Sequence, residues 1–266
     1  MTLSLNQKYL AVHRQGFMPI FVQDEFDARL LVDCAVAAGA EAIEITCRRS
    51  AVLEEVRWAR KAHPQLTIVA GSVVDDGPLL SNLQRRRPDM PSIDALLAAG
   101  VDGVVSALPL RLKTIERVSR THLVIPGVET MTEAVAVVEA GAHFAKLFTA
   151  DLLGGSARVA RMTCAATHGV LPLFVTGGIT LARIEEYVKA GAAMLGSGWD
   201  VILGSDYVSL QKTPDQAVIA GALVSFLSGM LTARHSLPDT WPDVNSADYA
   251  HRLRHFVPSS ALEGRL

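Results

Sequence analysis

The sequence has no excess of charge of either sign. The chain of 266 residues carries 25 Lys and Arg residues against 27 Asp and Glu residues, which gives a formal net charge of -2. No field of one sign is therefore available to hold a nucleic acid or an anionic membrane surface. A small metabolite is the partner that this balance favours, and we expect no nucleic acid and no membrane as partners.

Cysteine is scarce, and the motifs that bind metals and cofactors are missing. Cys34, Cys47 and Cys164 stand alone without a C-x-x-C spacing, which argues against a disulfide framework and a zinc site. The eight histidines show no ligand spacing, and neither a G-x-G-x-x-G nor a Walker-type loop occurs. The sequence thus predicts a protein of the reducing cytoplasm that works without a metal or an organic cofactor.

Long hydrophobic runs are absent as well. No stretch reaches the roughly 18 consecutive apolar residues that a membrane-spanning helix needs. The N-terminal residues M-T-L-S-L-N-Q-K-Y lack the basic segment and apolar run of a signal peptide. We expect neither export nor insertion into a membrane.

Short hydrophobic runs are abundant, and they alternate with amphipathic helical stretches along most of the chain. This alternation is typical of parallel βα units, and eight such runs predict a (β/α)8 TIM barrel of the α/β class. The chain would form one domain over residues 1–234, followed by a C-terminal extension, 235–266, that packs on the barrel or on a neighbouring subunit. The predicted strands are 17–22, 42–46, 66–72, 103–107, 123–127, 143–148, 171–176 and 193–196.

One segment, 74–92, is too long and too rich in proline for an ordinary connection. It follows a predicted strand, so we expect it at the carboxyl face of the barrel, where barrel enzymes keep their active sites. Arg85, Arg86 and Arg87 within it are expected to form a solvated surface. Contact with an anionic substrate or with a neighbouring subunit is the alternative.

Lys146 is the residue that suits its surroundings least. It stands between Phe144, Ala145, Leu147 and Phe148 in a predicted buried strand, where an ammonium group costs several kcal/mol. Burial disfavours the ammonium form of a lysine, so that some free amine is present to attack a carbonyl and form a Schiff base. The alternative is a structural lysine that reaches the barrel rim or pairs with a carboxylate.

The second predicted strand ends in I-E-I-T-C-R-R. Its alternation places Glu44 and Thr46 on one face and Ile43, Ile45 and Cys47 on the other, and we expect Glu44 to point into the barrel. There it could move protons for a lysine-derived imine, or form a structural ion pair. Arg48, just beyond the strand, is placed to hold a substrate carboxylate, whereas Arg49 is expected to face solvent.

Glycine-rich turns follow the last two predicted strands. They read F-V-T-G-G-I-T and M-L-G-S-G-W-D, and turns at these places in a barrel commonly offer backbone N–H groups to a phosphate. Glycine also serves any tight turn, so each motif alone is a weak signal. Together they predict an anion site, for which the candidate phosphate-binding residues are Gly177, Gly178, Ser197 and Gly198.

Between Gly16 and Trp199 the strand-end motifs resemble, in order, those of the 2-keto-3-deoxy-6-phosphogluconate (KDPG) and 4-hydroxy-2-oxoglutarate (KHG) aldolases. That family consists of class I lyases with a (β/α)8 barrel that usually assemble as trimers. The motifs are P-I-F-V, I-E-I-T-C-R, A-G-S-V, V-V-S, V-I-P-G-V-E-T, A-K-L-F, V-T-G-G-I-T and G-S-G-W.

The resemblance implies a role for each matching residue. Lys146 would form the Schiff base with the pyruvyl carbonyl, and Glu44 would act as general acid and base. The pyruvate carboxylate would be held by Arg48, Ser72 and Thr176. Phe148 would line the pocket beside the lysine.

The chain also departs from the family pattern. Ser72 stands where threonine is usual, Ala107 replaces a proline, and T-A-D replaces P-A-E after Phe148. At the eighth strand G-S-G-W replaces G-G-S-W, which moves the serine hydroxyl by one residue to Ser197.

The sequence therefore predicts a homotrimeric class I aldolase that cleaves a 2-keto-3-deoxy(-phospho) sugar acid or a 4-hydroxy-2-oxo acid to pyruvate and an aldehyde. One alternative is a non-catalytic barrel that binds a sugar phosphate or a keto acid as a regulatory subunit. Another is a sugar-phosphate isomerase or epimerase. The aldehyde half, its stereochemistry and the need for a phosphate stay open.

Overall fold

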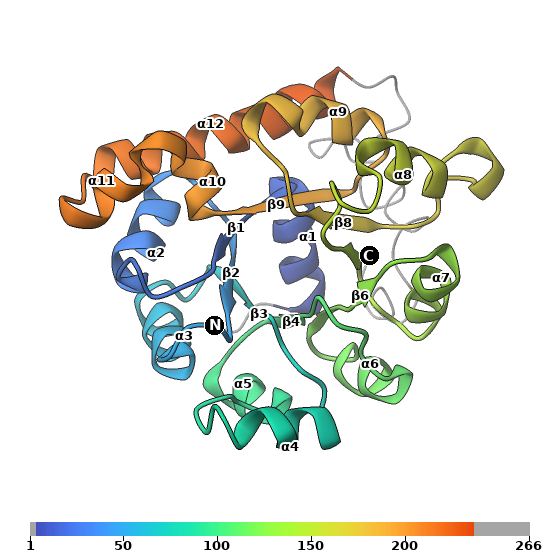
Figure 1. Ribbon diagram of the computed structural model, residues 1–266, viewed down its shortest axis with the longest axis horizontal. Coiled ribbons are helices and arrows are strands. Elements are labelled where there is room, and N and C mark those ends of the chain that lie inside the picture. The colour runs from blue at the N-terminus through green and yellow to red at the C-terminus, as the bar shows by residue number, and fades with distance from the viewer. Residues whose placement is uncertain (1–3, 237–266) are drawn as a thin grey trace.

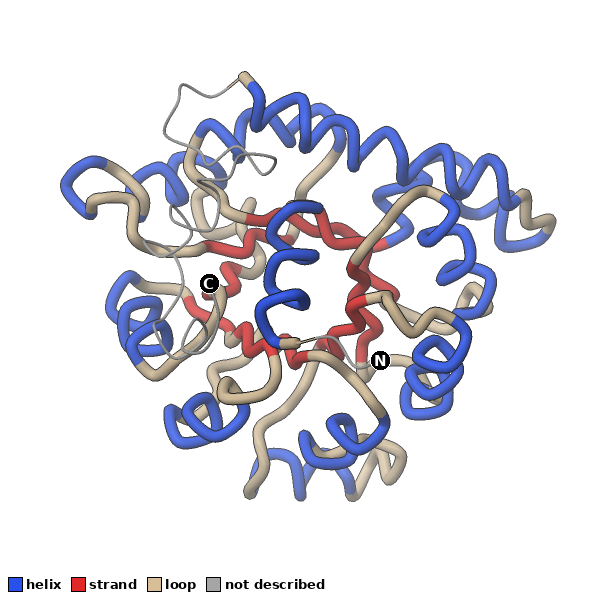
Figure 2. Tube along the Cα trace, turned by 180° about the vertical axis from the view of Figure 1, so that it is seen from behind, coloured by secondary structure: helices blue, strands red, loops and turns tan. Residues whose placement is uncertain are grey.

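The structure, a computed structural model, describes residues 4–236 and confirms the (β/α)8 barrel (Figure 1). Its strands are all parallel, in the order β5-β4-β3-β2-β1-β9-β8-β7-β6. Helices surround the ring of strands (Figure 2). The strands are β1 (Phe17–Phe21), β2 (Ala42–Thr46), β3 (Thr67–Gly71), β4 (Gly103–Val105), β5 (Leu123–Ile125), β6 (Gly127–Val128), β7 (Ala145–Leu147), β8 (Leu173–Thr176) and β9 (Met194–Gly198).

The ring closes because β5 and β6 are the two halves of the single strand predicted at 123–127. Pro126 separates them, since proline has no N–H to donate to a neighbouring strand. Its carbonyl still accepts a hydrogen bond from the backbone N–H of Lys146 at 2.8 Å. β5 pairs with β4 and β6 pairs with β7, so the divided strand completes an eight-membered barrel.

Eleven helices follow the first strand in the described part of the chain, together with three short 3-10 turns. The long helices pack their apolar faces on the outside of the barrel. The eleven are α2 (Ala28–Ala37), α3 (Val52–Ala62), α4 (Pro78–Gln84), α5 (Ile93–Ala99), α6 (Leu112–Val118), α7 (Met131–Glu139), α8 (Gly155–Met162), α9 (Ile184–Lys189), α10 (Trp199–Leu203), α11 (Tyr207–Lys212) and α12 (Gln216–His235).

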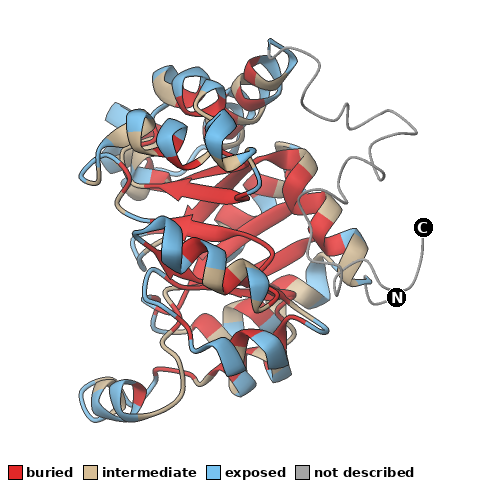
Figure 3. Ribbon diagram, turned by 90° about the vertical axis from the view of Figure 1, so that its right-hand side faces the viewer, coloured by how far each residue is buried: buried red, intermediate tan, exposed pale blue. Residues whose placement is uncertain are grey.

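The strands of the barrel are buried (Figure 3), and their alternation divides the buried side chains into two cores. Ile43, Ile45 and Cys47 belong to the outer core between strands and helices, as predicted. The inner core fills the barrel and includes Phe144 and Phe174. Along β7 and β8, side chains two residues away from Phe144 and Phe174 therefore also face the interior of the barrel.

A helix before the first strand, α1 (Leu5–Gln15), closes the amino end of the barrel, where it crosses the ring of strands in Figure 2. Tyr9 stacks on Phe144 of the inner core with ring centroids 5.4 Å apart, and the buried Lys8 lies 3.3 Å from Asp102. This helix is not among the elements predicted from the sequence. Its signal is the capping box formed by Ser4 and Gln7. With the amino end covered, the carboxyl end remains for chemistry.

The final helix, predicted at 213–234, runs from Gln216 to His235 and is capped by Asp215. By length and mean hydropathy it could cross a membrane. One face of it packs against α2, α9, α10 and β1 through Ile219, Leu223, Phe226 and Met230 among others. That the chain meets no membrane stays a prediction. Apart from its first two residues, the predicted extension 235–266 lies outside the described residues.

The unusual segment 74–92 contains α4 and follows β3 at the carboxyl face, as expected. Arg85 and Arg86 are exposed, which agrees with the predicted solvated surface. Arg87 behaves differently because it donates to the backbone carbonyl of Cys47 at 3.1 Å and pairs with Asp89. The segment is therefore tied to the end of β2, beside the predicted site.

Two buried histidines make the fold sensitive to acid. Burial lowers the pKa of His143 to about 4, and burial together with the charge of Arg234 lowers that of His13 well below its ordinary value. In the unfolded chain both imidazoles take up a proton near pH 6.5, so below that pH the unfolded state binds more protons. We expect the free energy of unfolding to fall as the pH drops from about 6.5 to about 4, with roughly 3 kcal/mol from His143 as an upper estimate.

Urea unfolding at several pH values measures this loss. The matched control is His143→Gln, since glutamine does not titrate and its amide oxygen can accept the Val124 N–H that bonds to His143 Nδ1 at 3.2 Å. The variant should have a shallower dependence on pH than the natural protein. Equal slopes would contradict the role of His143.

Candidate active site

Lys146 lies in β7 on the interior side of the barrel, with only 5% of its surface exposed. Its Nζ is 3.4 Å from Glu44 Oε1, and it stands over the ring of Phe174 at 5.2 Å. Glu44 lies in β2 and Phe174 in β8, and both side chains face the interior of the barrel. The predicted inward positions of Lys146 and Glu44 therefore bring an amine and a carboxylate together, 102 residues apart in the chain.

Glu44 is almost completely buried, at 1% exposure, and only one of its oxygens has a partner. Among the described residues, Oε2 accepts no hydrogen bond. A buried polar atom without a partner costs about 1–3 kcal/mol, and more for a charged group. A carboxylate held in this way is ready to accept a proton or a hydrogen bond from a bound molecule.

The glutamate fits only because Gly71, at the end of β3, has no side chain. A Cβ atom at Gly71 would lie 2.0 Å from Glu44 Oε1 and 2.7 Å from its Cδ. Gly71 is not among the site residues predicted from the sequence. Its signal was the glycine in A-G-S-V at a strand end, which often marks the close approach of another group.

Arg48 and Arg49 differ in environment, and the expectation for Arg49 was wrong. Arg49 is 2% exposed and donates to both carboxylate oxygens of Glu55, at 2.7 and 2.8 Å. The alternation of β2 stops at Thr46, where the chain turns, so it does not extend to these two residues. Arg48 is exposed and makes no ion pair with another described residue. It is therefore free to bind a substrate carboxylate.

The two hydroxyl residues predicted to hold the substrate carboxylate, Thr176 and Ser72, lie at the ends of strands. Thr176 ends β8, two residues after the inward Phe174, and its Oγ1 is buried without a hydrogen-bond partner among the described residues. Ser72 follows β3 with a φ of 52°, in the left-handed region that a serine rarely adopts. Such a residue costs about 1–3 kcal/mol and is common at functional sites. Phe148 is 44% exposed, with its ring 5.9 Å from Lys146 Nζ.

The predicted anion site has a mixed outcome. Gly177 and Gly178 are consecutive left-handed residues, with φ of 91° and 77°, as in the backbone turns that bind anions. Ser197 instead donates its hydroxyl proton to the carbonyl of Ile179 at 2.5 Å and belongs to the outward parity of β9. That proton is not available to a phosphate. At Gly198 a Cβ atom would lie 2.3 Å from Asp200 Oδ1, so a carboxylate already covers this turn.

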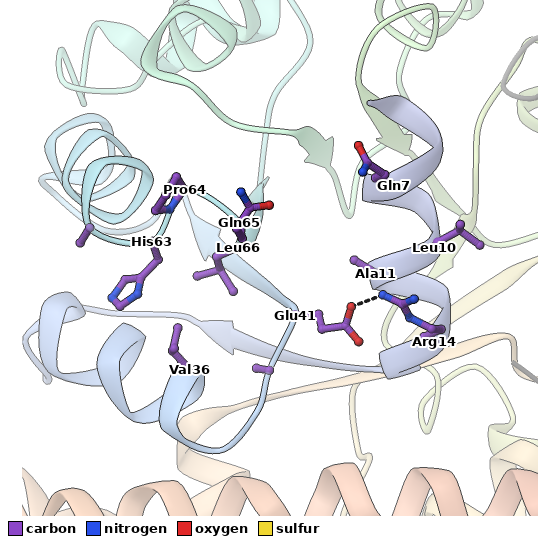
Figure 4. Close-up of a pocket in the computed structure, with 12 residues that line it drawn as sticks. Gln7, Leu10, Ala11, Arg14, Val36, Glu41, His63, Pro64, Gln65 and Leu66 are labelled. Atoms are coloured by element: carbon purple, nitrogen blue, oxygen red, sulfur yellow. Dashed lines mark hydrogen bonds and ion pairs between the residues drawn. The ribbon is translucent and has the colours of Figure 1, made fainter. Parts of the chain in front are cut away.

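A cavity of about 620 Å³ lies at the opposite end of the barrel (Figure 4). Gln7, Leu10 and Arg14 of α1 form one side, and the connection from His63 to Leu66 forms the other. Arg14 forms an ion pair with Glu41 across it. The cavity contains none of the predicted site residues, and it lies at the amino ends of the strands. Size alone does not mark the candidate active site of this protein.

Comparison with known proteins connects this arrangement to one family. The family model described as KDPG and KHG aldolase matches residues 11–220. The KHG/KDPG aldolase of Escherichia coli (strain K12) is 23% identical over 210 residues, which cover 76% of this chain and 90% of that protein. The 2-dehydro-3-deoxy-6-phosphogalactonate aldolase of the same strain is 28% identical over 193 residues, covering 70% and 82%.

Solved structures show the same fold. The KDPG aldolase from Legionella pneumophila, captured with pyruvate as a covalent carbinolamine intermediate, is similar with a TM-score of 0.66 and 20% identity, over 82% of this chain and 97% of that one. The KDPG aldolase from Zymomonas mobilis ATCC 29191 has a TM-score of 0.64 and 20% identity, over 85% and 97%.

Proposed function

The chain belongs to the KDPG and KHG aldolase family and is thus a carbon–carbon lyase, and on this premise we propose that it works as a class I aldolase through an imine on Lys146. Its substrate would be a 2-keto-3-deoxy or 4-hydroxy-2-oxo acid, and its products pyruvate and an aldehyde. The observation that carries the proposal is the buried Lys146–Glu44 pair, with its 3.4 Å separation. The covalent pyruvate adduct of the Legionella pneumophila neighbour supports it.

The reaction would begin at the lysine amine. It adds to the C2 carbonyl of the substrate, and loss of water gives the protonated imine. The three predicted carboxylate partners, Arg48, Ser72 and Thr176, would orient the substrate at the same time. Arg48 supplies charge at the mouth of the barrel, while the two hydroxyls donate from the ends of β3 and β8.

Glu44 would then take the proton of the C4 hydroxyl. The bond between C3 and C4 breaks, its electron pair moves into the imine, and an aldehyde leaves an enamine on Lys146. Protonation at C3 and addition of water release pyruvate and restore the amine. The free Oε2 of Glu44 supports this role because it leaves an acceptor where a substrate hydroxyl would bind.

The two alternative functions, a regulatory barrel and an isomerase or epimerase, have less support. A regulatory barrel without catalysis would gain nothing from a buried amine and a half-satisfied carboxylate, which are costly unless they are used. An isomerase or epimerase would use Lys146 without a covalent bond to substrate. The homotrimer and the cytoplasmic location remain predictions from the resemblance and the composition.

Reduction with borohydride in the presence of pyruvate tests the proposal. Borohydride converts an imine to a stable amine, so mass spectrometry of peptides should find the pyruvate-derived mass increase on Lys146. Protein without pyruvate is the control. A folded protein that gives no adduct at Lys146 would exclude the imine mechanism.

A further inference from the structure

The turn that follows β2 carries Arg48, and the residues beside Arg48 are fixed by contacts with three other segments of the chain. The guanidinium group of Arg49 donates to both carboxylate oxygens of Glu55 in α3, at 2.7 and 2.8 Å. The backbone N–H of Ser50 donates to Asp24, which follows β1, at 3.1 Å. The side chain of Arg48 is exposed. These contacts therefore fix the backbone around Arg48 and leave its guanidinium group available.

The third contact comes from the segment 74–92. Arg87 Nη1 donates to the backbone carbonyl of Cys47 at 3.1 Å, across 40 residues of the chain. This carbonyl and the N–H of Arg48 belong to one planar peptide unit, so a hydrogen bond to the carbonyl fixes the orientation of both. Cys47 is 1% exposed, and its own N–H donates to the carbonyl of Gly71 at 2.8 Å. Arg87 therefore orients the peptide unit that leads into Arg48.

Arg87 is itself fixed in position. Its Nη2 atom lies 2.5 Å from Asp89 Oδ2, and its backbone carbonyl accepts the N–H of Met90 at 3.0 Å. Met90 is 3% exposed and belongs to the outer core, so this end of the segment is anchored to the barrel. Hydrogen bonds from a charged donor are stronger than those between neutral groups. The guanidinium group can therefore keep the Cys47 carbonyl in one orientation.

The other end of the segment is attached to α6. Asp75 accepts the backbone N–H of Arg111 at 2.7 Å and the hydroxyl of Thr114 at 2.9 Å, at the start of that helix. The helix α4 lies in the chain between these attachments and outside the ring of strands (Figure 1). Contacts at both ends thus give the segment a fixed position beside the turn that carries Arg48.

We propose that Arg87 is a positioning residue that acts through the carbonyl of Cys47 to place Arg48 for the substrate carboxylate. The inference rests on the proposed function, in which Arg48 binds that carboxylate. The other two arginines of the run, Arg85 and Arg86, are exposed, and neither forms an ion pair with another described residue. The segment 74–92 then serves the active site through one arginine that does not touch the substrate.

Borohydride labelling of Lys146 at increasing concentrations of pyruvate tests the inference, because pyruvate contains the carboxylate that Arg48 would bind. In Arg87→Gln we expect the half-saturating concentration to rise at least about threefold, with the maximal labelling unchanged, since the imine chemistry itself is intact. Arg86→Gln is the matched control, because it removes the same charge from an exposed neighbour. An unchanged half-saturating concentration in Arg87→Gln, or an equal rise in Arg86→Gln, would overturn the inference.

A double variant tests whether Arg87 acts through Arg48. Arg48→Gln should raise the half-saturating concentration more than Arg87→Gln does, because it removes the group that binds the carboxylate. Adding Arg87→Gln to Arg48→Gln should then cause a further rise of less than about 1.5-fold, since the side chain that Arg87 positions is gone. Two effects that multiply independently would overturn the inference.

The same experiment separates this inference from the proposed function. A natural protein that gives no adduct at Lys146 would overturn the proposed function and the inference together. An adduct in the natural protein, with a half-saturating concentration that Arg48→Gln raises and Arg87→Gln leaves unchanged, would overturn the inference alone.

Discussion

Lys146→Arg is expected to abolish the borohydride adduct with pyruvate and to lower kcat/KM by roughly 10⁴-fold or more. Arginine keeps a positive charge near Glu44, but its guanidinium group does not lose a proton and cannot form the imine. Loss of activity in this variant therefore reports on the nucleophile and not on the charge. Pyruvate release and the mass of the labelled peptide are the two measurements.

Lys146→Met provides a second test, which distinguishes the effect of Lys146 on stability from its effect on catalysis. Removing the ammonium group leaves the Glu44 carboxylate buried without a partner, which should lower the free energy of unfolding by about 3–5 kcal/mol. The double variant K146M/E44Q has no buried charge at this place and should regain much of that stability while remaining inactive. Thermal unfolding measures the first effect. Substantial cleavage activity in any of these variants would contradict the role of Lys146.

Glu44→Gln is expected to lower kcat by about 10²- to 10⁴-fold, the usual contribution of a general acid or base. Glutamine has nearly the same volume and can still accept a hydrogen bond from Lys146, but it cannot take the proton of the substrate hydroxyl. Pyruvate should still be trapped at Lys146, at a reduced rate.

Gly71→Ala should produce a similar loss without altering either catalytic side chain. The added Cβ would overlap Glu44 Oε1 and Cδ and would force the carboxylate away from its position 3.4 Å from Lys146 Nζ. Gly221→Ala is the matched control, since nothing lies within 4 Å of a Cβ at Gly221. Normal turnover by a folded Gly71→Ala protein would show that the position of Glu44 is not critical.

Much of the fold could be predicted because parallel strands leave a strong local signal. Buried β runs, separated by amphipathic helices, placed all eight strands of the barrel. The same alternation put Ile43 and Ile45 outside and Glu44 inside. Lys146 could be singled out for a related reason: a lysine flanked by apolar neighbours in a buried strand requires a special environment.

The errors arose where local periodicity ends. Arg49 follows the last residue of β2, and its burial depends on Glu55 from the next helix, which no spacing rule includes. The anion site stays a prediction, although the outward parity of β9 directs the hydroxyl of Ser197 to the carbonyl of Ile179. Pro126 divides a strand that the hydrophobic pattern presented as continuous.

By itself, the sequence determined the barrel, the family resemblance and the two residues proposed to carry the chemistry, because each depends on residue type and on the two-residue period of a strand. Only the tertiary structure decided how these parts meet. It placed Lys146 3.4 Å from Glu44 and closed the amino end of the barrel with α1. It also brought Glu44 against Gly71, where the absence of a side chain leaves room for the carboxylate. Contacts between distant segments depend on the packing of the whole barrel, and no local pattern in the chain contains that information.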